Sequence, residues 1–322
     1  MKKCTIGQAF LARFEAGLNP RHPERSAIPA RVLGYGEIST VFEIAAAEAQ
    51  GWACKRMPMF RDEAEAERYE ALYRDYVRTL GDTIGLRVAP GEVLRLADRS
   101  HGRVVLYIIQ ERFPAAAIGH RAIQRLAPAQ VMRLVQAVLR EAGRVFDFNQ
   151  THQGMLELGL DAQISNWVIA GWTDDAVVLP DPLELIYLDT STPLLRRNGQ
   201  EQLNPELVLR SAPSFTLWFI RRAFLPEVMT RYYDFRRVAL DLVANFYKEG
   251  RPDLVPDLVA TVNDFFRAAA AYRPLTVQEV RDYYRFDALI WRVFLALRKL
   301  DRGLQTAAGR SYPYILPERI RR

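Results

Sequence analysis

Apolar and polar positions along the chain follow two patterns, which change near residue 112. Before this point, short apolar runs predict β-strands over 30–57 and 91–111, with one amphipathic helix over 61–80 between them. The helix has an apolar stripe made of Tyr69, Leu72, Tyr73, Tyr76 and Leu80. After residue 112 helical spacing dominates, over 128–150, 215–224, 232–249, 254–271 and 276–300. We therefore expect an α+β chain, in which an antiparallel sheet with one main helix precedes a mostly helical region.

The two ends of the chain stand apart from this pattern. Residues 6–17 predict a short amphipathic helix with Phe10, Leu11 and Phe14 on one face. The basic residues 313–322 predict a loosely held tail. The chain is thus divided into a helical extension over 1–29, a sheet region over 30–112 and a helical region over 113–322.

Candidate chemistry gathers between residues 158 and 193. Asn166 runs into the apolar triplet 167–169, and Asp189 closes a second apolar run, 185–188. A hairpin of these two strands would bring Asn166 and Asp189 together, with Asp161 just ahead of them. Two carboxylates and an amide at one loop suit a hard divalent cation and a catalytic base. The alternative is that all three are turn or cap residues.

A glycine-containing hairpin is predicted near the start of the sheet. Gly34 and Gly36 are followed by Ser39 and Val41, and a further strand leads to Lys55. Small residues at these positions would let backbone amides approach phosphate oxygens. The alternative is an ordinary tight turn. A dinucleotide-binding fold is not indicated, because a strand and not a helix follows the glycines.

The order of these motifs over residues 30–195 resembles the protein-kinase-like fold, in which two lobes enclose a nucleotide. The loop Asp161-x-x-x-x-Asn166, followed by a strand and then a strand ending in Asp189, is closest to the aminoglycoside phosphotransferase and choline kinase branch. That branch has His-Gly before the aspartate, where this chain has Gly159 and Leu160. Asp189 is followed by Thr190 and Ser191 instead of Phe-Gly.

The resemblance implies a role for each motif. Residues 30–112 would form the nucleotide-binding lobe and 113–322 the catalytic lobe. The implied nucleotide-site residues are Gly34, Gly36, Ser39, Val41, Lys55, Glu65, Glu111 and Phe113. Lys55 would grip the phosphates and pair with Glu65, or with Glu67 as the second choice, while 110–114 would be the hinge beside the base. Asn166 and Asp189 would hold Mg²⁺, Asp161 would be the catalytic base, and Asp241 would brace its loop.

These roles imply transfer of phosphate from ATP or GTP to a small-molecule hydroxyl. Protein serine/threonine kinases have a lysine two residues after the catalytic aspartate, where this chain has Gln163. Two alternatives remain. One is a catalytically weak or inactive member, a pseudokinase that binds nucleotide or serves as a scaffold. The other is a nucleotidyl transferase on the same fold.

Composition narrows the class of protein. Hydrophobic residues make up 49% and charged residues 25% of the 322-residue chain, as in ordinary soluble globular proteins. The net charge of +6 is mild and the arginines are scattered, so nucleic-acid binding is not expected. No apolar run of membrane-spanning length occurs, and Cys4 and Cys54 lie far apart. We expect a cytoplasmic protein without membrane insertion, and the sequence identifies no protein partner.

Overall fold

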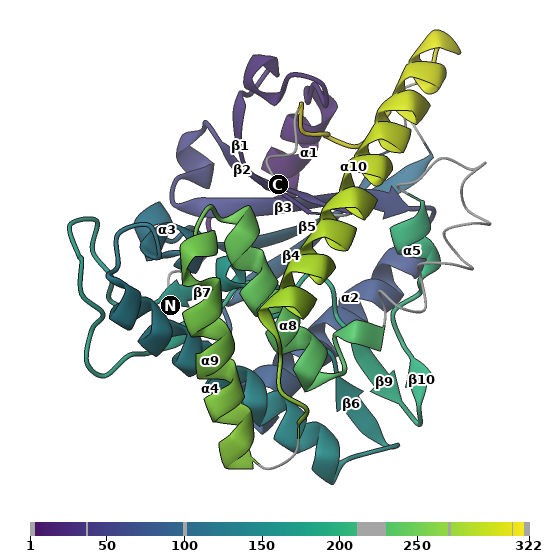
Figure 1. Cartoon of the computed structure of the whole chain (residues 1–322). Helices are drawn as coiled ribbons and strands as arrows, with labels where there is room; N and C mark the ends of the chain where they lie inside the picture. Colours follow the sequence, from purple (N-terminus) through teal and green to yellow (C-terminus); the bar gives the residue numbers. More distant parts are fainter. Residues whose placement is uncertain are drawn as a thin grey trace.

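The computed structural model of the protein describes residues 4–36, 38–98, 102–210, 230–269, 272–310 and 312–318. Within them, a five-stranded sheet lies toward one end of the molecule and a group of helices toward the other (Figure 1). The long helix α10 (Val277–Ala307) crosses in front of both in this view. The predicted α+β class, with a sheet first and helices after it, is confirmed.

The sheet is antiparallel throughout, with the strand order β1-β2-β3-β5-β4. Its strands are β1 (Ala30–Tyr35), β2 (Thr40–Ile44), β3 (Trp52–Phe60), β4 (Gly91–Asp98) and β5 (Arg103–Glu111). Helix α2 (Glu63–Arg78) follows β3, and Asp62 caps it by accepting a 2.8 Å hydrogen bond from Glu65 N. Five antiparallel strands with the main helix after the third form the N-terminal part of a kinase-like fold.

Different helices cover the two faces of this sheet. The tyrosine stripe of α2 packs on one face, and α1 (Gln8–Ala16) packs on the other. On the α1 side, the rings of Phe14 and Phe42 lie 5.4 Å apart. A buried ion pair joins Arg56 to Glu15, which also accepts a hydrogen bond from the Tyr107 hydroxyl. Helix α1 is thus tied to the sheet by apolar and ionic contacts.

The C-terminal region is built around helices that share one large apolar core. Its longer helices are α4 (Pro128–Thr151), α8 (Phe235–Lys248), α9 (Val255–Ala269) and α10, and the shorter ones are α3 (Gly119–Ala122) and α5 (Glu206–Leu209). The same region holds two small sheets of short strands: β6 (Leu156–Leu158), β7 (Trp167–Ile169), β8 (Leu185–Tyr187), β9 (Leu195–Arg197) and β10 (Gln200–Glu201). The predicted hairpin is confirmed, because β7 and β8 pair antiparallel with Trp167 opposite Tyr187. The helix predicted over 215–224 lies outside the described residues.

The end of the chain returns to the N-terminal sheet. Arg56 donates a 2.6 Å hydrogen bond to the Pro313 carbonyl, and Thr40 donates one of 3.3 Å to the Ile315 carbonyl. Tyr314 and Leu316 are buried beside Ile38. The prediction of a loosely held tail is therefore wrong for residues 313–316, because their apolar side chains fill space at the edge of the glycine hairpin.

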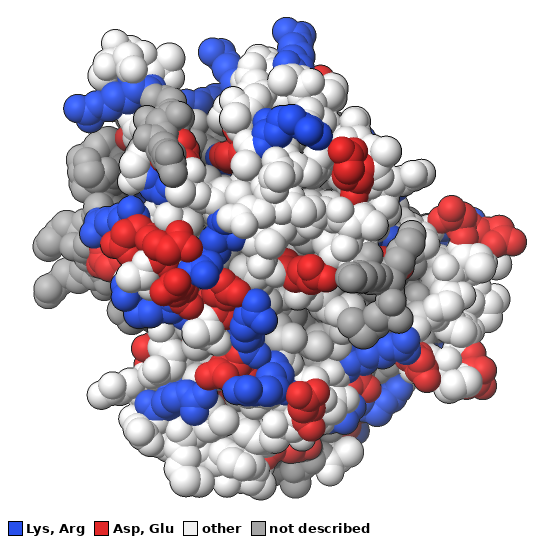
Figure 2. Space-filling model, turned by 180° about the vertical axis from the view of Figure 1, so that it is seen from behind, with Lys and Arg blue, Asp and Glu red and all other residues white. Residues whose placement is uncertain are grey.

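Charged side chains of both signs are mixed on the surface. On the face opposite to that of Figure 1, Lys and Arg alternate with Asp and Glu over the residues that the structure describes (Figure 2). No helix among the described residues combines the length and the apolar character needed to cross a membrane.

Candidate active site

Asp161 and Asn166 lie on one loop that is joined to the strand leading to Asp189. The loop ends in a short helical turn over Ile164–Asn166, from which β7 begins. The Asn166 side-chain Nδ2 donates a 3.0 Å hydrogen bond to the Asp161 carbonyl, and its backbone carbonyl accepts one of 2.8 Å from Leu188 N. The side-chain amide thus fixes the loop at one end and leaves its Oδ1 oxygen as a ligand that could hold a cation.

Asp161 is in an environment that favours its protonated form. Burial raises the pKa of this carboxyl, the nearby carboxylates of Asp241 and Asp189 raise it further, and a hydrogen bond from Gln163 N and the charge of Arg231 oppose them. The Gln163 N–H lies 3.0 Å from Asp161 Oδ1. A carboxylate with a raised pKa that is held by one oxygen is suited to accept a proton from a hydroxyl group.

Lys55 meets Asp189 at the other side of this loop. Lys55 Nζ lies 2.8 Å from Asp189 Oδ1 and 2.6 Å from Ser191 Oγ. Burial raises the pKa of Asp189, but the Lys55 ammonium and the hydrogen bonds from Lys55 and Ser191 outweigh burial and lower it. Asp189 is therefore an ionised carboxylate. Asp189 follows Leu188, which is hydrogen-bonded to the backbone of Asn166. A carboxylate and an amide on neighbouring segments suit Mg²⁺, which prefers hard oxygen ligands shared with phosphates.

The expected ion pair between Lys55 and Glu65 is not formed. Glu65 is only 8% exposed, and its carboxylate accepts hydrogen bonds from Arg61 N and from Arg210, the latter with Nη2 2.7 Å from Oε1. Glu67, the second choice, pairs with Arg95. Glu65 lies in the first turn of α2. Tyr69, one turn later, donates a hydrogen bond to the carbonyl of Ser191, the residue whose hydroxyl binds Lys55.

The glycine hairpin lies on the same sheet as Lys55. Gly34 pairs with Val41 across β1 and β2, and Val41 pairs in turn with Lys55 on β3. Gly36 N donates a 2.9 Å hydrogen bond to the Ser39 carbonyl, and a Cβ on Gly36 would lie 2.7 Å from Ser39 Oγ. A side chain at position 36 would therefore displace the Ser39 hydroxyl. Val41 and Lys55 are direct partners, so their side chains project from the same face of the sheet.

The predicted hinge lies at the end of β5. Glu111 pairs with Trp52, and Phe113 packs partly buried against the core of the helical region. The side chain of Gln110 adds a link that the sequence did not indicate, because its Nε2 lies 3.3 Å from the carbonyls of Ala89 and Leu188. This segment therefore joins the sheet to the strand that carries Asp189.

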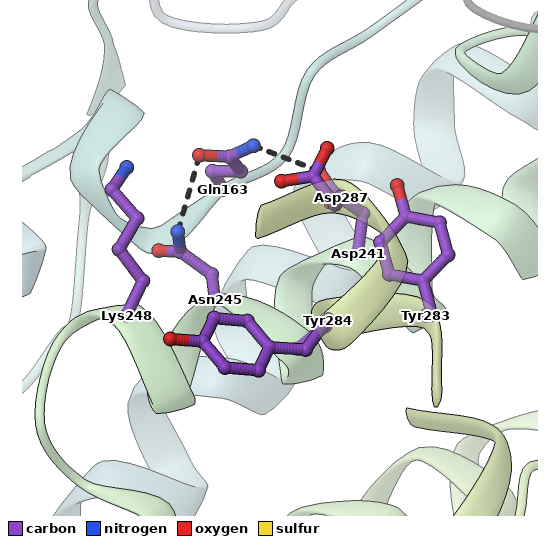
Figure 3. Close-up of a pocket in the computed structure, with 8 residues that line it drawn as sticks. Gln163, Asp241, Asn245, Lys248, Tyr283, Tyr284 and Asp287 are labelled. Carbon is purple, nitrogen blue, oxygen red and sulfur yellow. Dashed lines mark hydrogen bonds between the residues drawn. The ribbon is translucent and has the colours of Figure 1, made fainter. Parts of the chain in front are cut away.

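Helix α8 supports the loop of Asp161 from below, as expected for Asp241. Gln163 Nε2 donates a 2.9 Å hydrogen bond to Asp241 Oδ2, and Asn245 Nδ2 donates one of 3.1 Å to Gln163 Oε1 (Figure 3). These side chains form one wall of a small polar pocket, and Tyr283 and Tyr284 of α10 form another. The pocket lies next to the loop of Asp161, on the side of α8.

Three residues of this site had no clear signal in the sequence. In the sequence, Ser191 is a departure from the kinase-like motif and Tyr69 is part of an apolar stripe. No motif points to Asn245. Their roles depend on contacts between segments far apart in the chain. Tyr69 and Ser191, for example, are 122 residues apart. A buried tyrosine has a hydroxyl that needs a partner, which was the one available hint for Tyr69.

Two solved structures match this chain at low sequence identity. One is described as "WaaP in complex with acyl carrier protein"; it is 16% identical, the match covers 72% of this chain and 90% of that chain, and the TM-score is 0.32. The other is the kinase domain of maize SIRK1, a sucrose-induced receptor kinase, bound to AMP-PNP. It is 11% identical, the match covers 68% of this chain and 69% of that chain, and the TM-score is 0.36. Because both TM-scores are below 0.5, the fold assignment depends on the strand order, the place of α2 and the hairpin of Asn166 and Asp189.

Comparison with other sequences gives a family. No curated protein matches the chain. The model of a family described as "Family of unknown function (DUF6206)" matches residues 21–302. This match takes in the glycine hairpin, Lys55, the loop of Asp161 and the strand of Asp189. The chain is therefore a member of the DUF6206 family.

Proposed function

We propose that the protein is a magnesium-dependent phosphotransferase that moves phosphate from ATP or GTP to a hydroxyl group of a small molecule. The observation that carries the proposal is the ion pair of Lys55 and Asp189, 2.8 Å apart, next to the loop that holds Asp161. A cation for phosphates, an ionised oxygen ligand and a carboxylate of raised pKa are the groups that phosphoryl transfer requires. In this proposal residues 30–112 bind the nucleotide and 113–322 hold the catalytic and acceptor groups.

Each residue has a role that follows from its charge. Lys55 binds phosphate oxygens, and Asn166 and Asp189 would hold Mg²⁺, which when bound neutralises the charge of the phosphates. Asp161 orients the acceptor hydroxyl and accepts its proton. The backbone at Gly34, Gly36, Ser39 and Val41 covers the phosphates, and the segment of Glu111 and Phe113 lies beside the base. Glu65 has no direct role toward Lys55, since Arg210 binds its carboxylate.

A small-molecule acceptor is supported by the surroundings of Gln163. In this chain the residue two positions after Asp161 is uncharged, and its side chain is held by Asp241 and Asn245. The polar pocket beside it is narrow and is lined by tyrosine, amide and carboxylate groups (Figure 3). Within kinase-like proteins we place the chain nearest to the aminoglycoside phosphotransferase and choline kinase branch.

A second candidate is a catalytically weak protein that binds nucleotide without turnover. It is favoured by Thr190 and Ser191 after Asp189 and by the engagement of Glu65 with Arg210. A nucleotidyl transferase is the third candidate. The three differ in product: a phosphorylated acceptor with nucleoside diphosphate, no product, or a nucleotidylated acceptor with pyrophosphate.

The first test is a titration of thermal stability with ATP and GTP, with and without Mg²⁺. A nucleotide at one hundred times its Kd stabilises the folded state by about 2.7 kcal/mol, enough for a rise in Tm of several degrees. We expect this rise for the natural chain with Mg²⁺ present, and we expect Asp189→Ala to abolish it. Product analysis after incubation with candidate alcohols then separates the three functions.

Asp175→Ala is the matched control, since Asp175 lies at the exposed tip of the hairpin between β7 and β8. This variant should respond to nucleotide like the natural chain. If neither nucleotide changes the Tm of the folded natural chain up to millimolar concentration, the proposed function is wrong.

A further inference from the structure

Helix α2 presents tyrosine hydroxyls to the two segments that carry the catalytic groups. Tyr69 donates a hydrogen bond to the Ser191 carbonyl, and Tyr76, two turns later, donates one of 2.8 Å to the Gly159 carbonyl. Both side chains are almost fully buried. A buried hydroxyl with a single backbone partner fixes the distance between the two segments that it joins. The helix is therefore attached to the segment after Asp189 and to the one before Asp161.

Ser191 continues this connection to Lys55. Its hydroxyl accepts a 2.6 Å hydrogen bond from Lys55 Nζ and lies 3.0 Å from Asp189 Oδ1, to which it donates. Ser191 is 5% exposed, so water does not compete freely for these bonds. The contacts run from the Tyr69 hydroxyl through Ser191 to the ammonium of Lys55. Within the part of the chain that the structure describes, Asp189 is the one carboxylate partner of Lys55, and a helix glutamate would have added a second.

We propose that Tyr69 and Ser191 are positioning residues for Lys55, and that they link α2 to the nucleotide site in place of an ion pair between Lys55 and a helix glutamate. The inference rests on the proposed function and specifies how its site is held. On α2 the neutral side chain of Tyr69 binds the Ser191 carbonyl, while the buried glutamate one turn earlier is held by Arg210. Movement of α2 would thus reach Lys55 through the backbone at Ser191.

The test uses the reactivity of Lys55, which needs no nucleotide. The chain contains only five lysines, Lys2, Lys3, Lys55, Lys248 and Lys299, so acylation of each can be followed by peptide mass spectrometry. Only 14% of the Lys55 side chain is exposed, and it is held against Asp189 and Ser191. Ser191→Ala removes one of these two contacts and should expose the amine to the reagent, so Lys55 should be acylated about tenfold faster. Tyr69→Phe should act in the same direction, and the other four lysines serve as internal references.

Two variants are matched controls. Tyr76→Phe removes a hydroxyl from the same face of α2, and Glu65→Gln removes the charge of the helix glutamate. In both variants the acylation rate of Lys55 should stay within about twofold of that of the natural chain. The reason is that the side chains removed bind Gly159 and Arg210, not Ser191. Circular dichroism confirms that each variant is folded. Unchanged acylation in both Ser191→Ala and Tyr69→Phe would overturn the proposal.

Nucleotide affinity gives the second measurement. Ser191→Ala removes a contact to the charged Lys55, and Tyr69→Phe removes the bond that holds Ser191. Each should weaken Mg²⁺-dependent ATP binding about tenfold, while Glu65→Gln should not. The reverse result, with Glu65→Gln alone weakening binding, would show that the glutamate pairs with Lys55 in the bound state. If the natural chain binds no nucleotide, the proposed function fails, and the acylation result still decides whether the link exists.

Discussion

Gly159 shows how packing at one residue shapes the catalytic loop. Its N–H donates a 2.9 Å hydrogen bond to the Leu194 carbonyl, and its carbonyl accepts one from Tyr76. A Cβ at this position would lie 2.8 Å from the Leu194 Cβ and 3.3 Å from the Tyr232 Cβ. In the aminoglycoside phosphotransferase and choline kinase branch, which the loop resembles, this position is a histidine. No side chain fits here because the neighbouring segments approach the backbone itself.

We therefore expect Gly159→Ala to destabilise the protein. Forcing a methyl group into a packed interior costs about 1–3 kcal/mol. The control is Gly303→Ala, because Gly303 lies in α10 with no heavy atom within 4 Å of its added Cβ. That variant should keep its stability or gain up to about 1 kcal/mol from helix propensity. Urea unfolding measures both, and equal stability of the two variants would contradict the packing argument.

At the scale of elements, the attachment of α1 depends on a buried charge. Glu15 and the Arg56 guanidinium are both largely buried, and Tyr107 completes the cluster. Burial raises the pKa of Glu15, but the charge of Arg56 and the hydrogen bonds from Arg56 and Tyr107 outweigh it and lower the pKa. A carboxylate whose pKa is lowered by folding stabilises the protein above its unfolded pKa of about 4.3, and this contribution is lost as the pH falls.

The variant Glu15→Gln should make this dependence visible. It leaves Arg56 buried without a carboxylate, so we expect a loss of about 3 kcal/mol or more at pH 7. The difference from the natural chain should shrink as the pH falls from about 4.3 through the lowered pKa of the folded Glu15, because the natural chain then loses the stability that its ionised carboxylate provides. Glu48→Gln is the control, since its pair with Arg13 is exposed and should matter by less than about 1 kcal/mol. A constant difference between pH 7 and pH 3 would contradict the assignment to Glu15.

Elements were predicted well wherever the pattern is local. The strands, α2 and the hairpin of Asn166 and Asp189 each follow from apolar spacing within one segment. The partner of Lys55 was predicted wrongly, because Glu65 and Tyr69 share one face of α2. Glu65 is instead bound by Arg210, 145 residues further along the chain, and Tyr69 is the side chain that reaches the segment after Asp189. Periodicity identifies the face of a helix but not its partner across the fold.

At the scale of the whole molecule, both ends of the described chain are attached to the N-terminal sheet. Helix α1 covers one face, and residues 312–316 bind at the edge beside Thr40 and Arg56. The carbonyls of Pro313 and Ile315 satisfy donors of β2 and β3. The sequence could not predict this, because residues 313–322 carry no regular pattern and their apolar side chains are complementary to a surface formed by distant segments.

Removal of this segment should loosen the sheet. A chain that ends at Arg310 loses the burial of Tyr314, Ile315 and Leu316, each of them less than a tenth exposed. Burial of one such side chain contributes about 1.5–3 kcal/mol, so a loss of at least about 3 kcal/mol is expected. Hydrogen exchange should accelerate at the amides of 38–42. A chain that ends at Glu318 is the control; if both truncations behave alike, the contacts of 312–316 do not support the hairpin.

The place of residues 313–315 also sets an order of events during synthesis. A chain leaves the ribosome from its N-terminus, and segments begin to fold as they emerge. The side chains of Arg56 and Thr40 are made well before their acceptors, which are backbone carbonyls 257 and 275 residues further along the chain. The glycine hairpin is thus made long before the segment that completes its hydrogen bonds. Until residues 313–315 have emerged, the edge of the hairpin lacks these two acceptors.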